Sequence, residues 1–403
     1  MLNRRQLLAG GAAVAAAPLP LRWARGERPI VIGDLNSYAA LPAFTRPYKR
    51  GWRLARAEIN ANGGVLGRPL EVVSRDDGGD PGQAVSTTQR LIQRDGAELL
   101  TGTILSNVGL AVSSTANRLG ALFLAAEPLS DALVWRKGKP RTFRLRPGTY
   151  VQAAILAERA ARMDATRWAL VAPNYEYGQA AVAAFKELLR AKRPDVTFVA
   201  EQWPPLFDID AASVVQAIDA AEPEAIFNVT FSTDLLTFVR EGGAREVFTG
   251  RQVVSMLTGE PEWMAPLGGD VPEGWVVTGY PWDSLDTEAH ARFRQRYTER
   301  FGESPRMGSV VGHTALHALA RAIGGADATG AEAVAGAMRG LRLDSPFGGI
   351  TFREVDQQST MGTFLGRTAV RDGEGRLADW TYKDGAAYLP GPEAAAERRA
   401  TGP

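Results

Sequence analysis

Few side chains in this chain could act as a nucleophile or general base. The 403 residues include three histidines and no cysteine, which excludes thiol nucleophiles, disulfides and thiolate metal sites. The sequence has no Gly-x-Ser-x-Gly turn, no phosphate-binding Gly-x-x-x-x-Gly-Lys loop and no Gly-x-Gly-x-x-Gly after a strand. Asp208 and Asp210 could form a hydrolytic carboxylate pair, but their Pro-rich surroundings favour a helix cap. We therefore expect no enzyme, with a hydrolase as the less favoured alternative.

Two of the histidines have a spacing that occurs in metal sites. His313 and His317 are four residues apart in a segment predicted as a helix over 310–323, so both rings lie on one helix face. The surrounding sequence offers no acidic partner of the His-Glu-x-x-His kind. Packing or an exposed helix face explains the pair more simply, so we expect neither a metal nor a cofactor.

Length and charge limit the class of protein. A single hydrophobic core stops growing near 250–300 residues, so 403 residues predict two domains or lobes. The apolar share of 45% and the charged share of 23% are those of a soluble globular protein. The formal net charge of +1 gives no reason to expect nucleic acid or anionic lipid as a partner.

The N-terminus has the pattern of an export signal. The twin arginines in Asn3–Leu8 precede a short, Ala-rich apolar run that Pro18 and Pro20 make unsuitable as a spanning helix. We predict a twin-arginine signal over residues 1–26, with a disordered basic leader as the alternative. Since no cysteine is available for a lipid anchor, the processed protein is expected free in the periplasm.

The rest of the chain alternates between strand and helix patterns. Short apolar β-branched runs alternate with amphipathic segments over 29–125, and the same alternation returns over 168–278. Two such series predict two doubly wound α/β lobes with parallel sheets. A mostly helical stretch and a β-rich stretch follow, and residues 391–403 are predicted to be a disordered tail.

In open α/β sheets, ligands bind beyond the carboxyl ends of the strands, at the starts of helices. The loop 102–107 follows a predicted strand and offers the polar side chains of Thr103, Ser106 and Asn107 at a helix start. A ligand site is therefore expected here, although Ser106 could simply cap its helix.

Several segments follow one another in the order seen in a known family. Each alone is a weak signal, but together they span nearly the whole chain after the leader. The segments are 58–69 (EINANGGVLGRP), Asp76-Asp77, Asp80-Pro81, 142–147 (TFRLRP), 175–178 (YEYG) and 345–352 (SPFGGITF). Their ordered set resembles the type I periplasmic binding proteins of the branched-chain amino-acid and amide-urea class.

The resemblance implies two lobes that close on a ligand by hinge motion, joined by three crossings near Pro147, Trp282 and Ser345. The lobes would then be 27–146 plus 283–345, and 147–282 plus 346–390. It also implies a monomer that delivers a small molecule to an ABC permease in the inner membrane. A periplasmic ligand sensor of the same fold is the alternative.

The resemblance also implies the residues that bind the ligand. Ser106 matches the serine that binds a ligand carboxylate, Tyr177 a tyrosine that closes over the ligand, and Glu260 an acid that pairs with an ammonium group. Phe44 and Phe231 match aromatic pocket positions. The expected set is completed by Tyr38, Thr103, Asn107 and Trp282.

One segment departs from the family pattern. Leu129 falls where a carboxylate-binding threonine is expected, and Glu127 adds a negative charge nearby. A buried, ionised Glu127 would repel a carboxylate at a cost of a few kcal/mol. We therefore expect a ligand with a donor-rich or cationic group, such as an amide, a urea-like compound or an amine. Alternatively, Glu127 is solvated or pairs with a nearby arginine.

Overall fold

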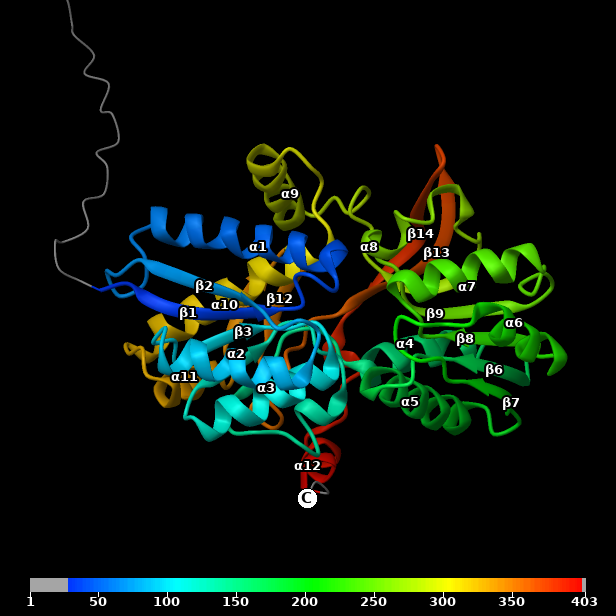
Figure 1. The fold of residues 1–403 in the computed structure, drawn as a ribbon, viewed down its shortest axis with the longest axis horizontal. Helices are drawn as coiled ribbons and strands as arrows, with labels where there is room; N and C mark the ends of the chain where they lie inside the picture. The colour runs from blue at the N-terminus through cyan, green and yellow to red at the C-terminus, as the bar shows by residue number, and fades with distance from the viewer. Residues whose placement is uncertain (1–27, 401–403) are drawn as a thin grey trace, which may run out of the picture.

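The computed structural model describes residues 28–400 and forms two α/β lobes that lie side by side (Figure 1). The predicted export signal over 1–26 lies outside the described residues. None of the helices within 28–400 has the length and apolar character needed to cross a bilayer.

The first lobe is built on a five-stranded parallel sheet in the order β2-β1-β3-β4-β5. Its strands are β1 (Ile30–Asn36), β2 (Leu70–Asp76), β3 (Leu99–Gly102), β4 (Leu122–Ala125) and β5 (Thr142–Arg144). Its helices are α1 (Pro42–Ala61), α2 (Pro81–Gln93), α3 (Ser106–Arg118), the short η1 (Asp131–Leu133), α9 (Glu288–Phe301), α10 (Met307–Ala326) and α11 (Ala331–Met338). β3 and β4 are buried along their whole length, as expected for a parallel sheet covered on both faces.

The second lobe has a seven-stranded sheet in the order β14-β13-β10-β9-β8-β6-β7. Its strands are β6 (Arg167–Val171), β7 (Thr197–Gln202), β8 (Ala225–Asn228), β9 (Gln252–Gly259), β10 (Val276–Gly279), β13 (Thr363–Arg371) and β14 (Glu374–Lys383). Its helices are α4 (Thr149–Ala160), α5 (Glu176–Lys192), α6 (Ala211–Ala220), α7 (Ser232–Ala244), α8 (Pro261–Met264) and the short η2 (Gly268–Asp270). Strands β6 to β10 pair in parallel, and β13 and β14 add an antiparallel edge. The predicted class, two doubly wound lobes, is confirmed.

Two helices begin as their sequences predict. The Asp80 side chain accepts a hydrogen bond from the Gln83 backbone N–H (2.7 Å) and Pro81 opens α2. Asp210 accepts from the Ser213 backbone N–H (3.1 Å) at the start of α6. Asp210 is thus a helix cap, as the Pro-rich context indicated, and not half of a hydrolytic pair.

The first and third crossings between the lobes run next to each other. The chain leaves β5 through Leu145 and returns to the second lobe after Ser359, whose hydroxyl donates to the Leu145 carbonyl. The Gln358 amide also donates to the Arg146 carbonyl (2.9 Å). The second crossing leads from β10 to α9.

The third crossing was predicted near Ser345, and this position is wrong. β11 (Arg342–Ser345) and β12 (Gly348–Thr351) pair as an antiparallel hairpin, so the chain turns back instead of crossing. The Phe352 ring then packs against Phe143 of β5, 6.1 Å between ring centroids. The first lobe therefore keeps the chain until about Ser359.

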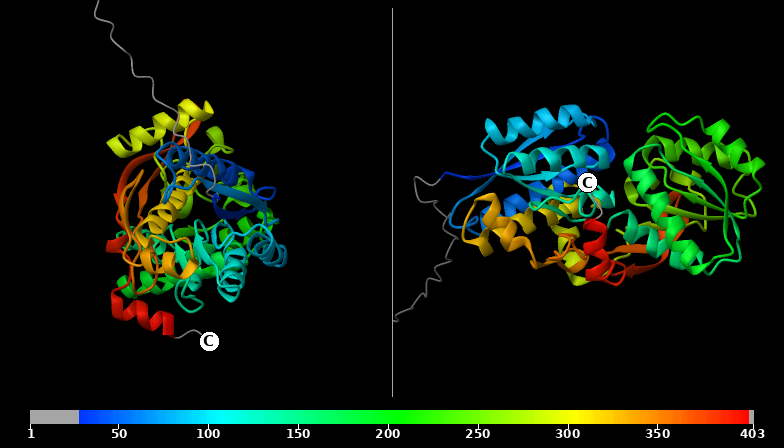
Figure 2. Two further views of the ribbon diagram at one scale, coloured as in Figure 1. Left: turned by 90° about the vertical axis from the view of Figure 1, so that its left-hand side faces the viewer. Right: turned by 90° about the horizontal axis from the view of Figure 1, so that it is seen from below.

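The predicted disordered tail over 391–403 is also wrong for its larger part. Residues Pro392–Ala400 form α12, which lies between the two lobes (Figures 1 and 2). Arg399 donates to the Gln357 side chain (2.5 Å) in the first lobe, and Arg398 pairs with Glu187 (2.7 Å) of α5 in the second. Partners in both lobes thus order a polar segment whose composition alone indicates disorder.

In the first lobe, α1 and α10 cross at backbone contact. Three glycines make this possible, since a Cβ at Gly51, Gly308 or Gly312 would lie 2.1 to 2.4 Å from a backbone oxygen of the other helix. For Gly312 that oxygen belongs to Tyr48, at 2.2 Å. Because the two helix backbones touch here, side chains of α1 and α10 near the crossing lie within reach of one another.

We predict that Gly312→Ala lowers the free energy of unfolding by about 1–3 kcal/mol, because the new methyl group must push the helices apart. Gly324→Ala is the matched control in the same helix, since no other described atom lies within 4 Å of its Cβ position. That change should be neutral or add up to about 1 kcal/mol, as alanine favours helix. Urea unfolding of both variants measures the difference, and equal stabilities would contradict the close crossing.

Candidate functional site

Arg146 in the first crossing holds one carboxylate from each lobe. Its Nη1 donates to Oε1 of Glu127, which follows β4 of the first lobe. Its Nη2 donates to Oε1 of Glu260, which follows β9 of the second lobe. All three side chains are buried, with at most 4% of each exposed. A single guanidinium therefore ties the two lobes together at the hinge.

Burial sets the charge balance of the triad formed by Arg146, Glu127 and Glu260. Removing one partner of a buried ion pair usually costs about 3–5 kcal/mol, because the other charge is left uncompensated. Here two carboxylates share one arginine, and burial raises the pKa of Glu127 to about 8. Burial also raises the pKa of Glu260, whose Oε2 accepts from the Trp263 indole N–H (3.1 Å). With a pKa of about 8, Glu127 keeps its proton at neutral pH.

An aromatic group lies beside the triad and spans both lobes. The rings of Tyr177 and Phe231, at the starts of α5 and α7, meet edge to face with centroids 5.7 Å apart. Phe231 packs against Trp263 at 5.7 Å, and Trp263 stacks on Phe44 of the first lobe at 6.5 Å. Together with the Arg146, Glu127 and Glu260 side chains, these four rings are called the interlobe cluster below.

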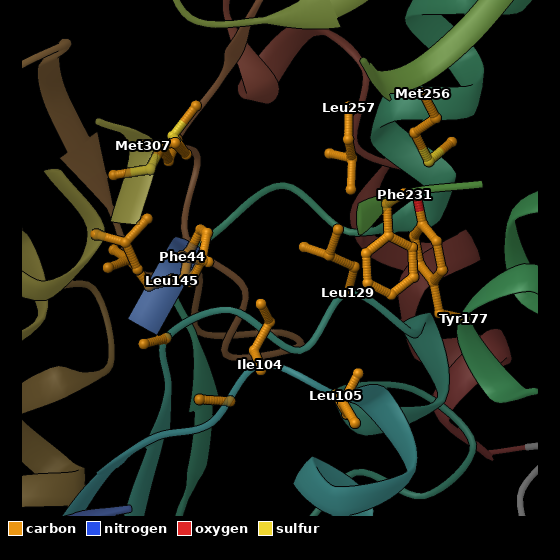
Figure 3. Packing of buried hydrophobic residues seen from close by; sticks show 14 of the residues in the cluster. Phe44, Ile104, Leu105, Leu129, Leu145, Tyr177, Phe231, Met256, Leu257 and Met307 are labelled. Carbon is orange, nitrogen blue, oxygen red and sulfur yellow. The ribbon is translucent and has the colours of Figure 1, made fainter. Parts of the chain in front are cut away.

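Aliphatic side chains complete the surroundings of the interlobe cluster. Ile104, Leu105 and Leu129 come from the first-lobe loops after β3 and β4, and Figure 3 shows them on the side facing Phe231 and Tyr177. Met256 and Leu257 belong to β9 of the second lobe, and all of these residues are part of one buried cluster. The site is thus apolar and aromatic apart from its charged and hydroxyl groups.

Two buried polar atoms of the interlobe cluster have no hydrogen-bond partner among the described residues. They are the hydroxyl of Tyr177 and Oε2 of Glu127. Burial raises the pKa of Tyr177 well above its ordinary range, so its hydroxyl stays protonated. Buried polar groups are almost always hydrogen-bonded in native proteins. Both atoms therefore need a further partner in the working protein.

Comparison with known proteins decides the family. The family model described as periplasmic binding protein matches residues 31–374. The chain belongs to this family.

Relatives of this periplasmic binding protein agree with that assignment. "Leu/Ile/Val-binding protein homolog 7" of Brucella suis is 24% identical over 353 residues, covering 83% of this chain and 86% of the relative. An amino-acid ABC transporter substrate-binding protein from Pseudomonas fluorescens superposes with a TM-score of 0.80 at 21% identity, covering 92% and 99%. A solute-binding protein of Rhodopseudomonas palustris in complex with 3,4-dihydroxybenzoic acid gives 0.80 at 19% identity, covering 91% and 99%.

The periplasmic binding protein has its lobes in contact on both sides of the hinge. The Ser130 hydroxyl of the first lobe donates to Glu176 of the second (2.7 Å), and Arg136 pairs with the same carboxylate (3.1 Å). Elsewhere, Glu262 of the second lobe accepts from the Gly308 backbone N–H (2.8 Å). These contacts join the two lobes in addition to the Arg146 triad.

Four of the predicted site residues lie in the interlobe cluster, namely Phe44, Tyr177, Phe231 and Glu260. Glu127 lies there too, but it faces Arg146, the alternative that the sequence left open. One Glu127 oxygen thus accepts from Arg146 while the other has no partner among the described residues, so the donor-rich ligand stays a prediction. Ser106 is the first residue of α3, and its hydroxyl accepts a hydrogen bond from the Ser130 backbone N–H (3.1 Å).

The remaining predicted residues have other partners. The Thr103 hydroxyl donates to Asp77 (2.5 Å) and the Tyr38 hydroxyl to Asp34 (2.5 Å), both within the first lobe. The Asn107 side chain accepts from the backbone N–H of Val108 (3.0 Å) in the first turn of α3. Trp282 lies under the Arg376 guanidinium and lines a separate pocket of about 290 Å³. These contacts do not bring Tyr38 or Trp282 into the interlobe cluster.

Arg146 and Trp263 are the members of the binding-protein site that the sequence analysis missed. Arg146 stands directly before Pro147, at a predicted crossing. A charged residue inside a hinge segment is the signal by which it could have been found. For Trp263 the signal is its residue type, since a tryptophan can line an aromatic pocket, but a place in the buried core explains a single tryptophan equally well.

We predict that the stability of the binding protein falls as the pH rises from about 6.5 to about 8. In that range the folded protein keeps the Glu127 proton, which the unfolded chain has already released above the ordinary carboxyl pKa of 4.5, so rising pH favours unfolding. Below about pH 6.5, His290 and His313 act in the opposite direction, because burial lowers the pKa of each to about 4. Glu262, whose pKa burial raises to about 7, contributes in the same direction.

Thermal melts between pH 5 and pH 8.5 measure this slope. Glu127→Gln, which has no proton to lose, should make the slope shallower. Glu299→Gln on the exposed face of α9 is the control and should leave it unchanged. A wild-type Tm that stays constant or rises between pH 6.5 and pH 8 would contradict the protonated state of Glu127.

Proposed function

We propose that this protein binds a small carboxylic acid with an aromatic or branched apolar body between its lobes, in the periplasm, and delivers it to an ABC permease. The observation that carries the proposal is the pair of unpartnered buried groups, the Tyr177 hydroxyl and the Glu127 carboxyl, within an aromatic lining.

The protonation of these two groups favours a ligand that accepts hydrogen bonds. Tyr177 keeps its proton because burial raises its pKa, and Glu127 keeps its proton up to about pH 8. Each then offers an O–H donor, and a carboxylate can accept from both. Charge-assisted hydrogen bonds of this kind are about twice as strong as neutral ones.

The apolar part of the ligand follows from the rings around these donors. Phe44, Phe231 and Trp263 offer faces and edges to an aromatic ring or a branched aliphatic chain. Among the proteins of the same fold, one from Rhodopseudomonas palustris is in complex with 4-hydroxybenzoate and one from Brucella ovis is a leucine-, isoleucine-, valine-, threonine- and alanine-binding protein. Both support a carboxylate ligand with an apolar body.

Capture then follows from hinge motion. A ligand that touches Tyr177 of one lobe and Glu127 of the other binds the closed form better than the open form, and so shifts the equilibrium toward closure. A scavenging protein of this kind needs micromolar affinity or better, about −8 kcal/mol. The closed form is the one that docks on the permease, and a twin-arginine signal brings the monomeric protein to the periplasm.

The test is a thermal-shift screen of the processed protein with benzoate, 4-hydroxybenzoate, leucine and valine, against short amides, urea and polyamines. A ligand at 100 times its Kd adds about 2.7 kcal/mol of stability, which raises the Tm by a few degrees. We expect an increase with one or more of the carboxylic acids. An increase with amides or amines alone would contradict the proposal and favour the donor-rich ligand.

We further predict that Tyr177→Phe weakens binding of the best acid at least tenfold, because a hydrogen bond to a charged group contributes about 1.5–3 kcal/mol. Isothermal titration calorimetry measures the change. The control is Tyr388→Phe, whose hydroxyl donates to Glu158 away from the interlobe cluster (2.7 Å) and whose loss should leave the affinity unchanged. Equal affinities of wild type and Tyr177→Phe would remove Tyr177 from the site.

A further inference from the structure

A second cluster of side chains lies in the first lobe, where α1 and α10 cross. Nε2 of His313 and Nε2 of His317 both face Oε2 of Glu58, at 2.9 Å and 3.1 Å. The two imidazole rings are neighbours on α10, with centroids 4.5 Å apart. Glu58 comes from α1, far away in the sequence, so the spacing of the histidines alone could not reveal it. From this convergence we infer a binding site for a divalent transition-metal ion of the zinc class.

The geometry of the three atoms suits such an ion. A ligand atom of each residue lies within 4.8 Å of the other two. Zinc bonds to imidazole nitrogen and carboxylate oxygen at about 2.0–2.2 Å in a tetrahedron, which places ligand atoms about 3.4 Å apart. The distances from the two nitrogens to the Glu58 oxygen need to grow by only a few tenths of an ångström. Two histidines and one glutamate are a common set of three protein ligands for zinc, and the fourth position is then open.

Access to the ion comes from a pocket on the surface of the first lobe. His313, His317 and Glu58 line one side of a hollow of about 790 Å³, and the side chains of Arg296 and Asp344 border it further. His317 is one-third exposed, whereas His313 is almost buried. An ion can therefore enter from solvent, and water can take the open position.

The surrounding charges decide which class of metal fits. Arg296 pairs with the second oxygen of Glu58 (3.0 Å), and Arg321 and Arg342 also line the hollow. These cations disfavour Ca²⁺ or Mg²⁺, which rely on many oxygen ligands and local negative charge. Zn²⁺, Co²⁺ or Ni²⁺ gain most of their affinity from the imidazole nitrogens and tolerate this environment better. Nδ1 of His313 has no hydrogen-bond partner among the described residues. Such a hydrogen bond normally orients a metal-binding imidazole and strengthens its bond to the metal. We expect micromolar affinity.

A metal bound here would connect the last turn of α1 to the middle of α10 inside one lobe. The site shares no residue with the interlobe cluster, so the inference does not depend on the proposed function. The protein also has only one other histidine, His290, whose Nε2 is hydrogen-bonded to the Tyr280 hydroxyl (2.6 Å). Metal binding can therefore be assigned with few variants.

The experiment uses the full processed chain prepared without a polyhistidine tag and stripped of metal with EDTA. Calorimetric titration with ZnCl₂ is expected to give one ion per chain, and CoCl₂ is expected to give the strong visible absorption of tetrahedral cobalt. MgCl₂ and CaCl₂ should give no binding. A wild-type protein that binds neither Zn²⁺ nor Co²⁺ would overturn the inference.

The variants separate this site from adventitious binding. His317→Ala and Glu58→Gln should each weaken Zn²⁺ about 100-fold and abolish the cobalt absorption, because each removes a ligand. Glu299→Gln on the exposed face of α9 is the matched loss of a carboxylate and should bind as the wild type does. Circular-dichroism melts without metal check that the variants fold. Zn²⁺ affinity unchanged in His317→Ala would overturn the inference.

Discussion

The buried guanidinium of Arg146, held by Glu127 of one lobe and Glu260 of the other, is the interaction that joins the two lobes at the hinge. Charges are costly to bury unless they are paired, so this triad is satisfied only while both lobes are in place. Arg146 lies two residues after β5, and the Gln358 amide of the third crossing donates to its carbonyl (2.9 Å). The hinge and the interlobe cluster therefore share this residue.

The rest of the site follows from the topology of the two sheets. In each lobe the loops after the parallel strands point toward the other lobe, which is where α/β folds place ligands. These loops bring the aromatic rings of Phe44, Phe231 and Trp263 next to the triad. Burial in this apolar surrounding in turn raises the pKa of Glu127, and in the proposed function the resulting O–H donor favours a ligand that accepts hydrogen bonds. In that proposal, hinge, lining and protonation act together in ligand choice.

Much of this was predictable from the sequence, and the failures have physical causes. The strand-helix alternation predicted both lobes. The family resemblance supplied Tyr177 and Phe231, which lie at helix starts and do meet. Glu127 was uncertain because its charge depends on Arg146, which only the folded hinge brings to it. Thr103 stays a prediction, and the sequence pattern could not show that its hydroxyl donates to the buried carboxylate of Asp77. The C-terminal segment was misjudged because composition cannot show that Arg398 and Arg399 have partners in both lobes.

The most direct test of the account is small-angle X-ray scattering of the wild type and of Arg146→Met, with and without the carboxylic acid that raises the Tm most. Methionine keeps much of the apolar volume but cannot join the two carboxylates. The account predicts that the radius of gyration of the wild type decreases on adding the acid, and that Arg146→Met does not contract at the same concentration. Full contraction of the variant, or saturation of the wild type without contraction, would contradict the account.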